Sequence, residues 1–266
     1  MSYQYIIDEW NALKLDTYVN NVLQVDDTWN YPDVKDSFNR LFIPINGEAF
    51  LKDDYGTYEM KNGQMYLIPA DTRCTYLCES TFCMYCLHFN VELFPGTDLF
   101  APFGQVRQLR CPQTRLESIR REVENESLEG VLHLKAILWQ NVYEFFLDGV
   151  DAVGYLDMVK GLRKQKPVLD YLSEYLTAAT RVEDIALALK MPVYRVSRTF
   201  RKDTGYGLKE YMERMLMQRA RYYLMYTDIP VSEISEKLGF ADPFYFSRFF
   251  KKSEKITPRD FRNRRF

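Results

Sequence analysis

The chain has 266 residues, of which 47% are apolar and 15% aromatic, enough to build the cores of two domains. It has no run of eighteen apolar residues and no basic and apolar leader, so membrane insertion and export are not expected. The number of cysteines is odd, five, which disfavours a disulfide framework. A cytoplasmic location is therefore expected. The net charge of −2 is uneven, because residues 167–266 hold 19 Lys/Arg against 13 Asp/Glu, a net +6, which leaves −8 on residues 1–166; only the second part is expected to bind a polyanion.

Residues 41–89 are predicted to form several short antiparallel strands. Apolar or aromatic runs are separated by Asn46-Gly47 and Asn62-Gly63, pairs that tolerate the positive φ of tight turns. Further runs follow at residues 74–77 and 82–89. Because no helical pattern lies between these runs, we expect a small antiparallel barrel or sandwich.

Two amphipathic helices are predicted next, at residues 114–126 and 128–147. The second carries an apolar stripe at intervals of three or four, which includes Leu134, Leu138 and Val142. The pair is expected either to cover the barrel or to present a dimer face. We therefore predict a sensing and dimerisation domain at residues 1–150, with helices at 113–148, and a linker at 151–166.

Residues 167–266 are predicted to be entirely helical. Asp242 is placed as a helix N-cap, and Pro192 and Pro243 suit first-turn positions. Six periodic segments are separated by short breaks, at residues 168–176, 182–189, 193–202, 208–226, 231–238 and 243–252.

This helical part contains an internal repeat. Ile185-x3-Leu189 followed by Val196-Ser197-Arg198-x-Phe200 returns as Ile234-x3-Leu238 followed by Phe246-Ser247-Arg248-x-Phe250. The first halves match at an offset of 49 and the second halves at 50, so the second turn has one additional residue. A short helix, a turn and a second helix in each copy predict two helix-turn-helix motifs, at about residues 182–203 and 231–252.

The second helix of each motif separates into an apolar and a polar face. Val193, Val196 and Phe200 are expected inward in the first copy, and Phe246 and Phe250 in the second. Hydroxyl, arginine and aromatic side chains are suited to base recognition, because Arg can contact guanine O6 and N7 together and an aromatic edge can touch a thymine methyl. The predicted base-contacting residues are Tyr194, Ser197, Arg198, Phe244, Ser247 and Arg248, and the predicted phosphate-contacting residues are Arg195, Arg201, Lys251 and Lys252.

Two segments of the second copy carry a family resemblance. They run from Ile234 to Asp242, with the sequence ISEKLGFAD, and from Phe246 to Lys252, with Thr257-Pro258-Arg259-Asp260-Phe261-Arg262 after them. With these motifs, residues 167–262 resemble the AraC/XylS transcription regulators. The resemblance implies seven helices, with two recognition helices bridged by the helix at 208–226 and inserted into successive major-groove segments on one side of the DNA. It also implies base contacts at the six positions given above and at Pro243.

The first half of the chain resembles the cupin-type effector barrel of the same family more loosely, at Gly47-Glu48, Gly63-Gln64, Ile68-Pro69 and His88-Phe89-Asn90. The fold class expected is therefore α+β, a cupin-like antiparallel barrel with covering helices followed by an all-α domain. A sugar or another metabolite is expected in the barrel as the effector. The residues expected to bind it are Phe42, Tyr58, Tyr66, Tyr76 and His88.

The function expected is sequence-specific, effector-controlled regulation of transcription, more often activation than repression, by a homodimer. The expected partners are double-stranded DNA, the effector and RNA polymerase, with no membrane and no cofactor. One alternative is a regulator without a ligand, controlled by its abundance or by a protein partner.

Enzymatic and metal chemistry are disfavoured by the residues available. A catalytic cupin metal needs clustered His and Glu, whereas this chain has only His88 and His133. A metal or redox sensor remains a second alternative, because Cys74, Cys78, Cys83 and Cys86 fall within thirteen residues. Cys83 and Cys86 should face opposite sides of a strand, so buried apolar thiols and no metal are expected.

Overall fold

The computed structural model describes residues 13–125, 127–149, 155–254 and 256–263. It divides into two compact units. The first comprises residues 1–93 and 98–155, and the second comprises residues 94–97 and 156–266. No helix in the described ranges is long and apolar enough to cross a membrane.

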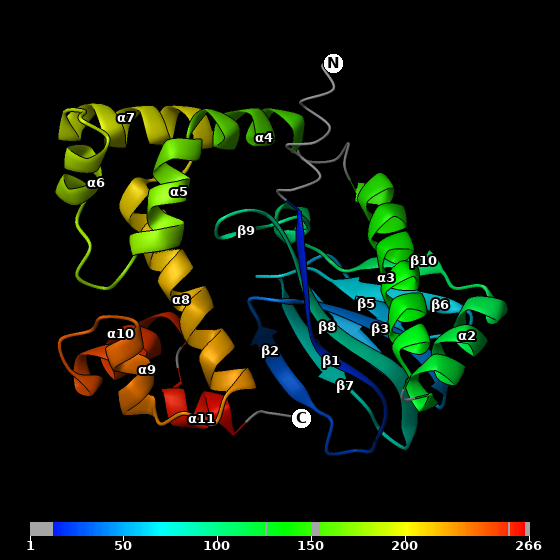
Figure 1. The fold of residues 1–266 in the computed structure, drawn as a ribbon. Helices are drawn as coiled ribbons and strands as arrows, with labels where there is room; N and C mark the ends of the chain where they lie inside the picture. The colour runs from blue at the N-terminus through cyan, green and yellow to red at the C-terminus, as the bar shows by residue number, and fades with distance from the viewer. Residues whose placement is uncertain (1–12, 126, 150–154, 255, 264–266) are drawn as a thin grey trace. The chain divides into compact units, whose positions relative to one another are not determined.

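The first unit is built on two antiparallel sheets (Figure 1). One has the strand order β1-β8-β3-β6-β10, with β9 paired to β8, and the other has the order β2-β7-β4-β5. The strands are β1 (Lys14–Val25), β2 (Tyr31–Lys35), β3 (Asn39–Asn46), β4 (Phe50–Lys52), β5 (Thr57–Glu59), β6 (Gln64–Ile68), β7 (Arg73–Leu77), β8 (Phe82–Phe94), β9 (Thr97–Asp98) and β10 (Arg107–Arg110).

Tight turns and a shared apolar core explain this arrangement. Gly47 and Gly63 have φ of 85° and 78°, the left-handed region that the two Asn-Gly pairs predicted. At Gly47 a side chain is also excluded by space, because a Cβ atom would lie 2.3 Å from the Thr81 carbonyl oxygen. Apolar side chains from both sheets, such as Phe42 of β3 and Tyr76 of β7, bury into one cluster.

Two helices pack on each other and on the edge strands β1 and β10 of the larger sheet. They are α2 (Gln113–Glu124) and α3 (Leu128–Gly149), preceded by a short 3-10 helix, η1 (Ala101–Phe103). Arg115 of α2 joins the two helices, because its guanidinium donates two parallel hydrogen bonds to the Glu144 carboxylate of α3, at 2.7 and 2.8 Å.

The second unit contains eight helices in the described part of the chain. α4 was not expected, because it forms where the sequence predicted a linker. α11 is too short to show periodicity, and it completes the seven helices that the family resemblance implied. α11 starts at a capped turn, since Thr257 Oγ1 accepts a hydrogen bond from the Asp260 amide at 3.2 Å. The helices are α4 (Tyr155–Lys164), α5 (Lys166–Tyr175), α6 (Val182–Ala188), α7 (Val193–Thr204), α8 (Leu208–Tyr226), α9 (Val231–Lys237), α10 (Pro243–Glu254) and α11 (Pro258–Arg262).

Candidate nucleic-acid interface

The helix pairs α6–α7 and α9–α10 lie at opposite ends of α8 in the second unit (Figure 1). Their turns have the same hydrogen bonds at the offset of 49 residues found in the sequence. The Met191 amide donates to the Ala186 carbonyl at 2.9 Å, and the Phe240 amide donates to the Ser235 carbonyl at 3.0 Å. The internal repeat is therefore a repeat of backbone geometry, with two helix-turn-helix motifs in one body.

Each turn places one residue in the left-handed region, Lys190 at φ 52° and Gly239 at φ 73°. This conformation costs a lysine roughly 1–2 kcal/mol and glycine almost nothing. Glycine is also required at 239 by space, since a Cβ atom would lie 2.7 Å from Thr177 Cβ.

The two recognition helices begin differently because of the additional residue in the second turn. Asp242 Oδ1 accepts a hydrogen bond from the Tyr245 amide at 2.7 Å, which makes it the N-cap predicted for α10. In α7 the cap position is Pro192, which has no side-chain hydrogen bond to offer.

The inner faces of α7 and α10 hold the motifs against the rest of the unit. Val196, Phe200, Phe246 and Phe250 are all fully buried, as predicted. Val193 differs from the expectation, because 39% of its surface is exposed. Val193 is the first residue of α7, and the buried residues of this helix begin at Val196.

The outer faces display the predicted base-contacting residues. Tyr194 and Phe244 are the most exposed of these residues, at 72% and 79%, so both aromatic rings are accessible to an external partner. Arg198 and Arg248 are exposed and form no ion pair with any residue that the structure describes. Both guanidinium groups thus keep all their donors available to an external acceptor.

Ser197 and Ser247 lie between these aromatic and basic groups and are half-buried. The Ser247 hydroxyl donates to the Pro243 carbonyl at 2.8 Å, so its oxygen remains an acceptor for a base amino group. The residues predicted to contact phosphate are all exposed and flank the same faces, namely Arg195, Arg201, Lys251 and Lys252.

Helix α8 joins the two motifs. Its 19 residues give it a length of about 28 Å at 1.5 Å per residue. The loop that precedes the first motif is bonded to the second motif, because the Ala178 amide donates to the Leu238 carbonyl at 2.8 Å.

Two arginines of α8 that the sequence did not single out stabilise this body. Arg219 donates to the carbonyls of Leu172 and Leu176 and so caps the C-terminus of α5. Arg221 forms a buried ion pair with Glu254 at the end of α10, with the Nη2–Oε1 distance 2.6 Å. An arginine inside an otherwise apolar helix stripe was the available sequence signal for both.

The residues predicted to bind the effector lie in the first unit and are largely buried. Phe42, Tyr66 and Tyr76 belong to the shared core, and Tyr58 packs against it. His88 is also buried, with Nε2 3.4 Å from Cys86 Sγ, and burial together with the positive charge of Arg40 holds its pKa well below the ordinary value.

Arg40 is a buried cation that the sequence analysis missed. Its guanidinium forms an ion pair with Asp36, donates a hydrogen bond to the Tyr76 hydroxyl and lies 5.0 Å from the Phe38 ring centre. The signal was an arginine in the apolar strand sequence of residues 39–46.

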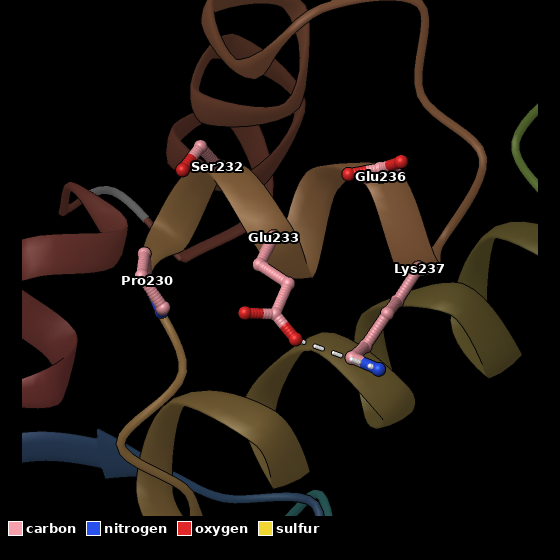
Figure 2. A pocket seen from close by; sticks show the side chains of 5 residues that line it. All are labelled: Pro230, Ser232, Glu233, Glu236 and Lys237. Atoms are coloured by element: carbon pink, nitrogen blue, oxygen red, sulfur yellow. Dashed lines mark ion pairs between the residues drawn. The ribbon is translucent and has the colours of Figure 1, made fainter.

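A separate surface pocket lies on α9, lined by Pro230, Ser232, Glu233, Glu236 and Lys237 (Figure 2). The figure shows the Glu233 and Lys237 side chains pointing toward each other, and their charged atoms are 3.6 Å apart. None of the predicted base-contacting or effector residues lines this pocket.

The cysteines do not form a metal-binding group in the described ranges, where no cluster of three or more His, Cys, Asp or Glu is present. Cys74, Cys78 and Cys86 are buried, whereas Cys83 is half-buried, in keeping with opposite faces of β8 for Cys83 and Cys86. Burial raises the pKa of both the Cys74 and the Cys86 thiol to about 12, so both are protonated at neutral pH.

Comparison with known proteins identifies the helical unit. The family profile described as "Helix-turn-helix domain" matches residues 185–264, which contain the second motif and all but the first residues of the first motif. A stretch of 99 residues is 31% identical to the regulatory protein PocR of Salmonella typhimurium, covering 37% of this chain and 33% of PocR. The HTH-type transcriptional activator RhaS of Yersinia pestis is 30% identical over 165 residues, covering 60% of this chain and 56% of RhaS.

The helical unit therefore contains the helix-turn-helix domain that its resemblance to the AraC/XylS transcription regulators predicted.

One relative matches across both units. The Msm operon regulatory protein of Streptococcus mutans is 21% identical over 241 residues, which is 87% of this chain and 86% of that protein. The chain spans a third of PocR and little more than half of RhaS. These names describe regulators and not enzymes.

The same two-domain fold occurs in ToxT from Vibrio cholerae, in a crystal structure described as bound to an unsaturated fatty acid. ToxT aligns over 92% of this chain and 95% of its own, with a TM-score of 0.57 and 13% sequence identity. The α+β arrangement expected from the sequence, a sheet domain followed by a helical domain, is thereby confirmed. The closed cupin barrel remains a prediction.

Proposed function

We propose that this protein is a sequence-specific, double-stranded DNA-binding regulator of transcription. The observation that carries the proposal is the pair of exposed stripes on α7 and α10, each with an aromatic side chain, a serine and an arginine that has no ion pair in the described ranges. The same three side-chain types recur at corresponding positions of both helices, and this combination is suited to base recognition.

Base recognition is assigned to Tyr194, Ser197, Arg198, Phe244, Ser247 and Arg248. Arg195, Arg201, Lys251 and Lys252 are assigned to phosphates, which fix the register without specifying sequence. Because α8 joins two different motifs in one chain, the proposed site is asymmetric, and we expect it to span two major-groove segments about 10 bp apart. Such a regulator works in the cytoplasm and carries out no catalysis.

Control by a small molecule is the second part of the proposal. The aromatic residues Phe42, Tyr58, Tyr66 and Tyr76, with His88, are proposed to bind a sugar or another metabolite in the first unit. Support comes from the buried Arg40 in the same core and from ToxT, a protein of the same fold whose structure is described as containing a fatty acid. Binding there would shift the populations of DNA-binding states and contact with RNA polymerase, more often toward activation.

A homodimer is proposed to form through α3. The side of this helix that does not pack on the sheet is apolar along its length, with Leu132 60%, Tyr143 56% and Leu147 54% exposed. An apolar stripe of that length on a charged surface is typical of a protein interface. Sedimentation of the full chain, compared with a Leu132→Lys variant, tests this part.

The central experiment is selection of duplexes from a randomised pool with the full-length protein, followed by titration of the selected duplex at several salt concentrations. A consensus with two conserved segments about 10 bp apart is expected. A pool that stays random, with binding that depends only on salt, would refute sequence-specific recognition.

The alternative of a regulator without a ligand makes a different prediction for the full chain. Thermal-shift screening against sugars and other metabolites should raise the Tm for at least one compound class if the effector proposal is correct. Unchanged Tm across the panel would favour control by abundance or by a protein partner.

If the protein were instead a cysteine-based metal or redox sensor, its Tm should depend on zinc or on a thiol oxidant. The high pKa of Cys74 and Cys86 disfavours it.

A further inference from the structure

Helix α4 precedes the first helix-turn-helix motif and lies outside residues 185–264, the segment that matches the family profile. It nevertheless belongs to the second unit from residue 156 onward. One side of α4 is buried there at helical spacing. Gly161 and Leu162 are fully buried and Gln165, which follows the last residue of α4, is 7% exposed, whereas Lys160 and Lys164 are exposed on the other side.

The buried side of α4 packs directly on the last turn of the recognition helix α7 (Figure 1). At Gly161 the two backbones are in contact, since a Cβ atom added there would lie 1.7 Å from the Asp203 carbonyl oxygen. No side chain fits at this distance unless one of the two helices moves. Glycine is unfavourable in a helix interior, so the close approach gives a physical reason for its presence.

A second contact holds the same turn of α7. Gln165 Nε2 donates a hydrogen bond of 2.6 Å to Asp203 Oδ2. The carboxylate makes this bond stronger than one between neutral groups. Gln165 is itself fixed, because its carbonyl accepts hydrogen bonds from the Val168 and Leu169 amides at the start of α5.

We propose that α4 is a positioning element for the first recognition helix, and that Gly161 and Gln165 are its positioning residues. This inference rests on the proposed function. α7 is held by its apolar face at one side and by α4 at its C-terminal end, so the direction of its outer stripe depends on the α4 contact. Base discrimination in the DNA segment read by α7 should therefore depend on α4, while the segment read by α10 should not.

The test compares full-length wild type with the Gly161→Ala and Lys160→Ala variants on the selected duplex. The DNA segments are first assigned to α7 and α10 with Arg198→Ala and Arg248→Ala. Discrimination is measured as the Kd for a duplex with one changed base pair divided by the Kd for the selected duplex. In Gly161→Ala, this ratio should fall by about five-fold or more for changes in the α7 segment and stay the same for changes in the α10 segment. Lys160→Ala, an exposed neighbour on the same helix, should change neither.

Hydrogen exchange without DNA provides a readout that does not depend on the proposed function. Amides in the last turn of α7, residues 201–204, should exchange faster in Gly161→Ala, and those of residues 251–254 in α10 should not. Equal changes in both helices, or none, would overturn the proposal. If exchange changes as expected but no variant shows base preference, the proposed function fails and the positioning role stands.

If Gly161→Ala does not fold, substitutions at Gln165 and Asp203 provide a second test. Gln165→Glu brings a second carboxylate to Asp203 and should produce the same loss in the α7 segment. The double variant Gln165→Glu/Asp203→Asn restores an amide–carboxylate hydrogen bond with the roles reversed, and should recover wild-type discrimination. A single variant without effect, or a double variant without recovery, would refute the proposal.

Discussion

The sharpest prediction concerns Arg198 and Arg248, one on each recognition helix. Alanine at either position removes a guanidinium that is exposed and has no ion pair in the described part of the chain, so the free energy of unfolding should change by less than about 0.5 kcal/mol. Loss of DNA binding in these variants can then be attributed to the interface.

The expected loss is specific to base and position. A bidentate contact from Arg to guanine is worth about 1–3 kcal/mol of discrimination, which corresponds to roughly a 5- to 150-fold change in Kd. Arg198→Ala should remove that discrimination in one DNA segment and Arg248→Ala in the other. Because the two helices lie at opposite ends of α8, the two losses should add in the double variant.

The assay is titration of the full-length protein onto the selected duplex and onto duplexes with single base-pair changes, at fixed salt. Lys209→Ala, at an exposed position near the start of α8, serves as the matched control for loss of one positive charge. If Arg198→Ala weakens binding to all duplexes equally, the side chain contacts phosphate only, and its assignment to base recognition is wrong.

Three further predictions follow from the structure. Lys251→Ala should reduce the slope of log Kd against log salt concentration by about one, and an unchanged slope would remove Lys251 from the phosphate-contacting set. Glu254→Ala leaves the buried Arg221 charge without its carboxylate and should lower the free energy of unfolding by about 3–5 kcal/mol in a denaturant titration; a loss below 1 kcal/mol would show that solvent reaches the pair. Glu144→Gln should cost about 1 kcal/mol at pH 7, because the hydrogen bonds from Arg115 lower the Glu144 pKa. That stabilisation is present above the ordinary pKa of 4.5 and is lost as pH falls through the lowered pKa, so a difference between variant and wild type that does not shrink as the pH is lowered would contradict the assignment.

Much of the helical unit was predictable from the sequence because its determinants are local. The spacing of Val196 and Phe200, repeated at Phe246 and Phe250, defines which side of each recognition helix is buried. The cap at Asp242 and the glycine at 239 mark where helices begin and end through hydrogen bonds and φ angles of neighbouring residues. The exposure of Arg198 and Arg248 could be predicted from the same periodicity, because side chains that are not on the apolar side of a helix face the solvent.

The sheet domain was predictable only in outline. The Asn-Gly turns predicted antiparallel strands, and both glycines have the positive φ that such turns need. Which side chains a strand buries depends on the opposite sheet, and so the burial of Arg40 against Asp36 and Tyr76 has no local signal beyond its apolar neighbours.

The sequence by itself thus determined the two helix-turn-helix motifs, their polar stripes and the basic character of the unit that carries them, because helix periodicity, capping and charge act within a few residues. Only the tertiary structure decided that residues 155–164 are a helix packed on α7, that Val193 is exposed, and that Arg221 pairs with Glu254. Gly161 falls in the segment that the sequence predicted as a linker, whereas in the fold it is the point where α4 contacts α7. The physical reason is that a close approach of two backbones depends on atoms about forty residues apart, and its free energy exists only once both helices are in place.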